Sequence, residues 1–139
     1  MNKILITGAS GQLGKSLKNH LSSKFKSYFF SRAELDINDL ETLSERLQSI
    51  NPDIIINCAA MTNVDHCEID SEKAFNINAY AISHFKNNFN GTFIQLSTDF
   101  VFDGVNGPYQ ENDLPNPINN YGLSKLKGEE IVKNLFEKH

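Results

Sequence analysis

The stretch KILITGASGQLG, residues 3–14, decides the fold of this chain. Lys3–Thr7 is a short, mostly apolar run, and glycines follow it at positions 8, 11 and 14. Leucines at positions 13, 17 and 21 then recur every four residues, which predicts one apolar stripe of a helix. A strand, a glycine-rich turn and a helix in this order are typical of the first unit of a parallel α/β sheet.

The same alternation continues along the chain. Further strands are predicted at Lys26–Phe30, Asp53–Asn57 and Thr92–Ser97, and their nearly continuous apolar content predicts cover on both faces. Helical periodicity runs from Leu40 to Ile50, from Ala74 to Phe89 and from about Tyr121 to Glu137, and Asn38 with Glu41 resembles a capping box before the first of these. We therefore predict an α/β protein with a Rossmann-like doubly wound parallel sheet, in one domain over residues 1–139.

The composition argues against several classes of binding partner. The 139 residues carry a formal net charge of −4 and no run of basic residues, which argues against nucleic acid. No apolar stretch is long enough for a secretory signal or a membrane span, so we expect a cytoplasmic protein without a membrane partner. Cys58 and Cys67 are most simply reduced thiols; a metal site at His66 and Cys67 is the weaker alternative, because no second ligand pair accompanies them.

The glycine loop predicts a dinucleotide site. In that reading Gly8 allows the tight turn, Gly11 lets the backbone approach a pyrophosphate, and Gly14 lets the helix lie close to the strand. The pyrophosphate would sit on the free N–H groups of the helix start, beside Ser10, Gln12 and Leu13. The alternative is an ordinary strand–turn–helix corner.

The end of the second strand predicts which dinucleotide. NAD binders carry an acidic residue there for the ribose 2′-hydroxyl, whereas this chain has Ser31 and Arg32. A guanidinium suits a 2′-phosphate, so we expect NADPH, with NADH possible, and we expect Asp36 and Ile37 to flank the adenine. The alternatives are that Arg32 is a solvated loop charge and that Asp36 only caps a turn.

Tyr121 and Lys125 form the candidate catalytic pair. They stand four residues apart on the predicted last helix, so they share one face. An ammonium near a tyrosine favours the phenolate, which suits proton exchange with a carbonyl oxygen. The corner Ser97-Thr98-Asp99 follows the fourth strand, where open α/β sheets bind ligands, so the Thr98 hydroxyl could hold that oxygen; otherwise it bonds its own backbone.

Taken together, GASGQLG, NCAAMTNVDHCE, AFNIN, LSTDFVFDG and GPYQENDLPNPINNYGLSKLKGEE resemble the dTDP-4-dehydrorhamnose reductases, a family of extended short-chain dehydrogenase/reductases. The resemblance extends from end to end of the chain. STDFVFDG and YGLSKLKGE are its specific motifs, whereas the glycine loop and the Tyr/Lys pair are common to the superfamily.

The resemblance implies a function and a set of roles. NADPH would reduce the 4-keto group of a nucleotide-linked 6-deoxy sugar, dTDP-4-dehydrorhamnose, within cell-surface polysaccharide biosynthesis. Tyr121 would protonate the 4-oxygen, Thr98 would orient the carbonyl and Lys125 would also hold the nicotinamide ribose. The other matched positions are Asn57, Ala59, Ala60, Asn78 and Ser97 for the cofactor side and, more weakly, Thr62, Val64, Asp65, Asp99 and Phe100 for the sugar nucleotide.

The sequence also departs from the family. Phe100 and Met61 stand where members often have Tyr. Each change removes a hydroxyl near the expected substrate side, so it bears on which sugar is bound more than on the class of reaction. The resemblance implies a longer fold with a C-terminal substrate domain that is absent from this chain, so we expect self-association and doubtful activity of the 139 residues alone. The alternatives are a nucleotide-sugar epimerase or dehydratase, and a non-enzymatic regulatory subunit resembling methionine adenosyltransferase β.

Overall fold

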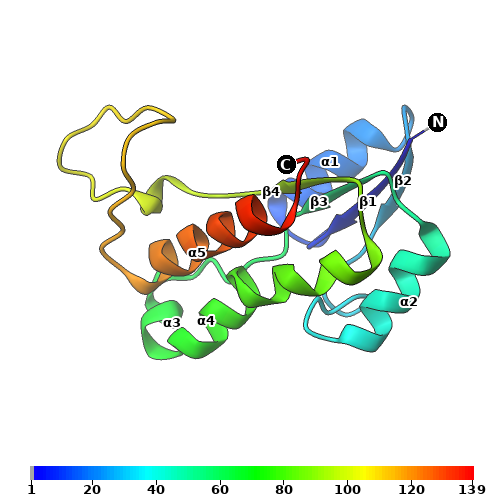
Figure 1. Ribbon diagram of the computed structural model, residues 1–139, viewed down its shortest axis with the longest axis horizontal. Coiled ribbons are helices and arrows are strands. Elements are labelled where there is room, and N and C mark those ends of the chain that lie inside the picture. Colours follow the sequence, from blue (N-terminus) through cyan, green and yellow to red (C-terminus); the bar gives the residue numbers. More distant parts are fainter. Residues whose placement is uncertain (1) are drawn as a thin grey trace.

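The computed structural model describes residues 2–139 and contains a parallel sheet of four strands in the order β2-β1-β3-β4 (Figure 1). The strands are β1 (Lys3–Thr7), β2 (Lys26–Phe29), β3 (Ile54–Asn57) and β4 (Thr92–Gln95). The chain moves outward from β1 to β2 and then returns past β1 to β3. The strand order therefore reverses between β1 and β3, which is the switch point where such sheets form a ligand crevice.

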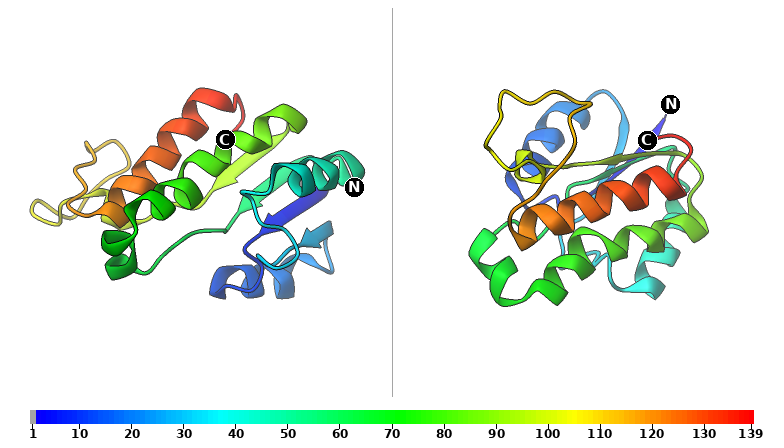
Figure 2. Two further views of the ribbon diagram at one scale, coloured as in Figure 1. Left: turned by 90° about the horizontal axis from the view of Figure 1, so that it is seen from below. Right: turned by 60° about the vertical axis from the view of Figure 1, so that its left-hand side comes forward.

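Helices lie on both faces of this sheet, so the predicted fold class is confirmed (Figure 2). α1 (Gln12–Leu21) lies on one face. The other face carries α2 (Leu40–Ile50), α4 (Ser71–Asn78), the 3₁₀ helix η1 (Tyr80–Asn88) and α5 (Asn120–Leu135). Apolar side chains from this second layer close over the middle of the sheet, and the largest cluster includes Leu5, Leu47, Ile55, Phe85, Phe93, Val132 and Phe136.

The predicted helix over Ala74–Phe89 is wrong in detail. α4 ends at Asn78, the backbone turns at Ala79 (φ −130°, ψ −68°), and η1 continues with a 3₁₀ bond from Ile82 N–H to the Ala79 carbonyl. The apolar face survives this break because Ala81, Ile82, Phe85 and Phe89 all stay buried. A short helix, α3 (Val64–Ile69), was also not predicted; six residues are too few for periodicity to reveal.

Cover on both faces, as predicted for all strands, holds for β1 but not for β4. Ile94 is 42% exposed, because α1 packs beside β2 rather than over β4. The leucine stripe of α1 is also only partly buried, with Leu13 43% exposed. At the outer edge of β4 the Phe93 N–H donates to the Lys138 carbonyl (2.9 Å). The self-association expected from the sequence stays a prediction.

The start of α2 differs from the predicted capping box. The N-cap is Asp39, whose carboxylate accepts from the Thr42 N–H (3.2 Å) and the Thr42 hydroxyl (2.7 Å). Asn38 instead donates its N–H and its side-chain amide to the Asp36 carboxylate (3.0 and 3.3 Å). The helix therefore begins one residue later than the capping-box pattern indicated.

We expect Asp39→Ala to lower the free energy of unfolding by about 1 kcal/mol, because it removes the acceptor for an N–H group at the helix start. Urea unfolding followed by circular dichroism measures this change. Asn38→Ala is the matched control and should change stability by less than about 0.5 kcal/mol. A larger loss for Asn38→Ala than for Asp39→Ala would contradict the assignment of the cap.

Candidate active site

The predicted site residues gather at one edge of the sheet. All four strands are parallel, so Gly8, Ser31, Cys58 and Leu96 follow their strands at the same carboxyl end. α5 reaches this edge with its first turns, where Tyr121 and Lys125 lie. The fold thus brings the glycine loop and the Tyr/Lys pair to one side of the molecule, as the sequence predicted.

The glycine loop is held tightly against β3 and α1. Gly8 adopts φ +64°, and a Cβ at this position would lie 2.6 Å from the carbonyl carbon of Cys58. A Cβ on Gly14 would lie 2.6 Å from the Gly8 carbonyl oxygen, so α1 starts closer to the loop than any side chain allows. Gly11 is the N-cap of α1 and offers no side-chain acceptor, which leaves backbone N–H groups of the first turn free for a ligand.

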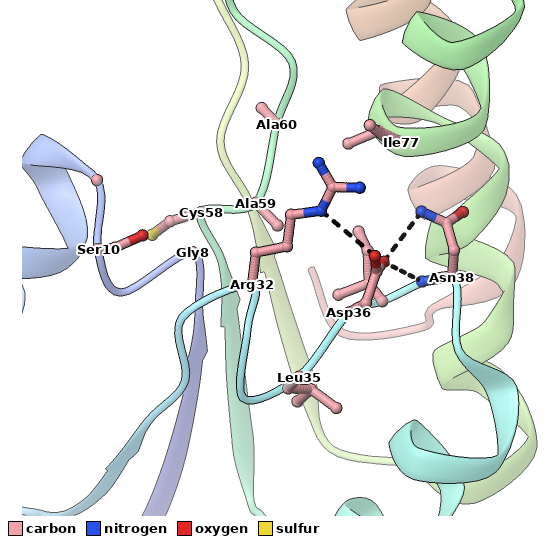
Figure 3. Close-up of a pocket in the computed structure, with 12 residues that line it drawn as sticks. Gly8, Ser10, Arg32, Leu35, Asp36, Asn38, Cys58, Ala59, Ala60 and Ile77 are labelled. Carbon is pink, nitrogen blue, oxygen red and sulfur yellow. Dashed lines mark hydrogen bonds and ion pairs between the residues drawn. The ribbon is translucent and has the colours of Figure 1, made fainter.

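A cavity of about 260 Å³ opens beside this loop (Figure 3). Its walls come from the ends of β1, β2 and β3 and from α4. The lining residues are Gly8, Ser10, Gly11, Arg32, Leu35, Asp36, Ile37, Asn38, Cys58, Ala59, Ala60 and Ile77. Eight of the predicted cofactor residues are among them, whereas Gln12 and Leu13 lie outside, exposed at the start of α1.

Arg32 and Asp36 form the charged wall of the cavity. Arg32 Nε lies 3.3 Å from Asp36 Oδ2, and the Arg32 side chain is largely exposed. Asp36 accepts the Asn38 N–H, and this hydrogen bond is the main reason that its pKa is below the usual value. Asp36 therefore accepts a hydrogen bond within its own turn and also lines the cavity, and its place beside an adenine stays a prediction.

Ser31 is engaged within its own turn. Its N–H and its hydroxyl both donate to Glu34 Oε2 (2.8 and 2.6 Å). The motif Ser31-x-x-Glu34 has the spacing of a capping box and was a signal that the sequence analysis missed. Arg32, rather than Ser31, is therefore the side chain of this pair that faces the cavity.

A chain of polar side chains, of which Thr7 and Asn57 are buried, connects the ends of three strands. The Thr7 hydroxyl donates to Asn57 Oδ1 (2.6 Å), and the Asn57 amide donates to Gln95 Oε1 (2.7 Å). Gln95 in turn donates to the Leu96 carbonyl (3.1 Å). Asn57 therefore supports the strand ends and does not line the cavity, whereas Ala59 and Ala60 do.

Lys125 is almost completely buried, with 4% of its surface exposed. Its ammonium donates to the Leu96 carbonyl, the last acceptor of the polar chain. Burial lowers the pKa of Lys125 to about 8, and the negative charge of Glu129 partly opposes that shift. A lysine with this pKa changes its charge close to physiological pH.

Tyr121 is buried in a small cluster with Cys67 and Ala74, against Met61 and Val64. Its ring also meets the edge of Phe100, with centroids 5.4 Å apart. Among residues 2–139 no hydrogen bond joins the Tyr121 hydroxyl to Lys125, so the two side chains share a helix face and an edge of the sheet without a direct bond. The phenol is left free to bind another group.

Thr98 and Ser97 are both engaged in local contacts. Thr98 Oγ1 accepts the Phe100 N–H (3.2 Å) and donates to Asp99 Oδ1 (3.2 Å), so it caps the 3₁₀ turn η2 (Asp99–Val101). This is the alternative that the sequence left open for its hydroxyl. The Ser97 hydroxyl donates to Glu129 Oε1, so Ser97 contacts α5 and does not line the cavity.

Asn78 connects α4 to the site. Its Oδ1 accepts the Met61 N–H (2.8 Å), and its amide donates to the Met61 carbonyl (3.0 Å) and to Ser124 Oγ (2.9 Å). Ser124 donates to the Tyr121 carbonyl (2.8 Å). Asn78 thus holds the segment after β3 against the first turn of α5, and it does not line the cavity.

The weaker substrate assignments divide into two groups. Asp99 and Phe100 line a second hollow of about 290 Å³ with Phe102, Asp103, Gly104, Tyr109, Ile118 and Asn119. Thr62 and Asp65 are exposed around the start of α3, and Val64 packs beneath Tyr121. The structure therefore brings only Asp99 and Phe100 to this hollow.

Side-chain contacts hold together the long loop between η2 and α5. The ring of Phe102 stacks on that of Tyr109 at 4.5 Å. Asp103 accepts hydrogen bonds from the Tyr109 hydroxyl, the Val105 N–H and the Asn116 amide, and the bond from Tyr109 is the main cause that lowers its pKa to about 2. Asp103 was not predicted from the sequence, because its partners lie up to thirteen residues away.

Within residues 2–139 no helix is long and apolar enough to span a membrane. In the same range no group of three or more His, Cys, Asp or Glu side chains is arranged to hold a metal ion. Cys67 lies in the cluster beneath Tyr121 and contacts the Met61 carbonyl through its sulfur at 3.6 Å.

Comparison with known proteins identifies the family. The sequence profile described as "RmlD substrate binding domain" matches residues 1–139. A dTDP-4-dehydrorhamnose reductase of Aggregatibacter actinomycetemcomitans is 35% identical over 144 residues, covering 99% of this chain and 49% of that protein. The β subunit of methionine adenosyltransferase 2 from Danio rerio is 37% identical over 139 residues, covering 94% of this chain and 43% of that protein. The chain spans about half the length of the curated relatives it matches.

Solved structures give the same result. A dTDP-4-dehydrorhamnose reductase from Bacillus anthracis, crystallised with NADP, superposes with a TM-score of 0.93 at 39% identity, covering 99% of this chain and 50% of that one. A UDP-glucose 4-epimerase from Brucella ovis, at 22% identity and a TM-score of 0.87, shares the fold. Because the profile covers the whole chain, the protein belongs to the RmlD family, in which the dTDP-4-dehydrorhamnose reductases are its relatives.

Proposed function

We propose that the protein uses NADPH to reduce the 4-keto group of a nucleotide-linked 6-deoxy sugar, dTDP-4-dehydrorhamnose to dTDP-L-rhamnose. This chain would supply the cofactor-binding part and the Tyr/Lys pair. The observation that carries the proposal is the placement of the glycine-loop cavity, Tyr121 and Lys125 at one carboxyl edge of the sheet. The relatives named as reductases of this sugar, and the neighbour crystallised with NADP, support the same chemistry.

The residues of the cavity fit a dinucleotide phosphate. The first turn of α1 offers backbone N–H groups to a pyrophosphate, and Gly8 keeps that approach free of a side chain. Arg32 has an exposed guanidinium with one ion-pair partner, Asp36, so it retains donors for a 2′-phosphate. Leu35, Ile37 and Ile77 give the apolar surface that an adenine ring requires.

The roles in the reaction follow from this placement. NADPH, when bound, supplies a hydride to the keto carbon. Tyr121 would donate a proton to the 4-oxygen, since its hydroxyl is free of other partners within residues 2–139. Lys125 would favour the resulting phenolate and hold the nicotinamide ribose. Thr98 would orient the carbonyl, which requires its hydroxyl to exchange Asp99 for the substrate.

A second candidate function rests on the 37% identity with the methionine adenosyltransferase 2 β subunit. In that case the chain would be part of a regulatory subunit, and the Rossmann-like fold would serve a protein interface. Recovery of a methionine adenosyltransferase in a pull-down, together with no turnover of sugar nucleotides, would favour this function over the reductase.

Replacing Tyr121 tests the reaction. We expect Tyr121→Phe to lower kcat by about 10²–10⁴-fold with little change in NADPH affinity, because the general acid is lost while the cavity is intact. NADPH oxidation with dTDP-4-dehydrorhamnose, assayed with the product of the complete reading frame, measures this. Tyr80→Phe is the matched control, because Tyr80 is exposed and lines neither the cavity nor the second hollow. Equal loss in both variants, or no turnover by the wild type, would contradict the proposal.

Replacing Arg32 tests the cofactor. We expect Arg32→Ala to weaken NADPH binding by about tenfold or more and to leave NADH binding unchanged, because only NADPH carries the 2′-phosphate. Fluorescence titration of the chain with each nucleotide measures both affinities. Lys24→Ala removes an equal charge before β2, at the opposite end of that strand, and should have no such effect. Equal wild-type affinities for NADPH and NADH would rule out the 2′-phosphate role.

A further inference from the structure

Two successive turns of α5 bind two successive residues after β4. The Lys125 ammonium donates to the Leu96 carbonyl, and one helical turn later Glu129 accepts the Ser97 hydroxyl. Lys125 and Glu129 are four residues apart, so their side chains leave the helix on the same face. The end of β4 is thereby held against α5 at the position where the buried ammonium lies.

The charged groups around Lys125 are few. Glu129 lies one turn along the same helix and favours the ammonium form by its charge, without an ion pair to it among residues 2–139, and Cys58 lies on the segment after β3. The segment after β4 contributes a carbonyl and a hydroxyl, and α4 is joined to α5 by the neutral pair of Asn78 and Ser124. Since a thiol is neutral over most of the physiological range, Glu129 is the permanent negative charge in this set.

Glu129 is itself held in place. In addition to the hydrogen bond from Ser97, its carboxylate lies 3.9 Å from the Lys133 ammonium on the next turn, and 23% of its side chain is exposed. The neighbouring Glu130 has a different environment: it pairs with Lys127 at 2.9 Å, and its side chain is 50% exposed. The helix thus carries two adjacent carboxylates, one directed to the end of β4 and one to solvent.

We propose that Glu129 is a positioning residue that keeps Lys125 in its ammonium form and fixes it at the carboxyl end of β4. A buried lysine without such a charge would release its proton and lose a donor. The proposal deepens the proposed function, because the ammonium is the form that would hold a ribose hydroxyl and favour a phenolate. Glu129 touches neither the cavity nor Tyr121, so it acts through Lys125 alone.

The direction of the pH effect follows from these charges. Burial places the pKa of Lys125 near 8, so about half of the molecules carry the ammonium at pH 8. Removing the Glu129 charge lowers the pKa further, and the ammonium is then lost at a lower pH. We expect an acid dissociation constant about 3- to 10-fold larger for Lys125 in Glu129→Gln than in the wild type.

The test is an NMR titration of the chain with ¹³C-labelled lysine, in which Lys125→Arg identifies the resonance. The midpoint for Lys125 should fall in Glu129→Gln and stay at the wild-type value in Glu130→Gln, which removes the same charge from the neighbouring residue. Glu129→Asp keeps the negative charge, so its Lys125 midpoint should stay close to the wild-type value. An unchanged midpoint in Glu129→Gln, or an equal fall in Glu129→Asp, would overturn the proposal.

NADPH affinity measured against pH separates this inference from the proposed function. If Lys125 holds the cofactor, affinity should fall as the ammonium is lost, and the fall should begin at lower pH in Glu129→Gln. A shifted titration of Lys125 with an affinity that is independent of pH would support the role of Glu129 and overturn the cofactor role of Lys125. The NMR result needs no ligand, so the two outcomes are distinct.

Discussion

The rest of the site depends on the chain of hydrogen bonds from Thr7 through Asn57 and Gln95 to the Leu96 carbonyl. Three parallel strands contribute one side chain each, at the point where each strand ends. Buried polar groups must be paired, so this chain fixes the relative height of the three strand ends. Its last acceptor also receives the Lys125 ammonium, which connects the glycine loop to the candidate catalytic helix.

A second set of contacts packs α5 against the ends of these strands. Asn78 binds Met61 and Ser124, and at the start of the helix the Asn120 N–H and side-chain amide donate to Glu68 of α3 (2.6 and 2.8 Å). These polar contacts hold the helix from two sides, while Val132 and Phe136 bury its far end in the core. The position of Tyr121 is therefore fixed by contacts with segments before and after it, rather than by the helix alone.

The sequence predicted most of the fold because its signals were local. Short apolar runs located all four strands to within two residues, and the glycine loop located the start of α1. It was wrong where tertiary contacts replaced local preference. The helix over Ala74–Phe89 breaks after Asn78, whose side chain binds the Met61 backbone, and the cap of α2 is Asp39 because Asn38 binds Asp36. It also could not show that β4 is left partly exposed on one face.

For the candidate site, the sequence by itself determined which chemical groups are present: the glycine loop, the arginine after the second strand, and the tyrosine and lysine four residues apart. Only the tertiary structure decided what each group contacts. Asn57 proved to be a support for the cavity rather than its wall, and Glu129 proved to be the acceptor for the Ser97 hydroxyl after β4. The physical reason is that burial, hydrogen bonding and pKa depend on neighbours 30 to 50 residues away in the chain, and no local pattern records them.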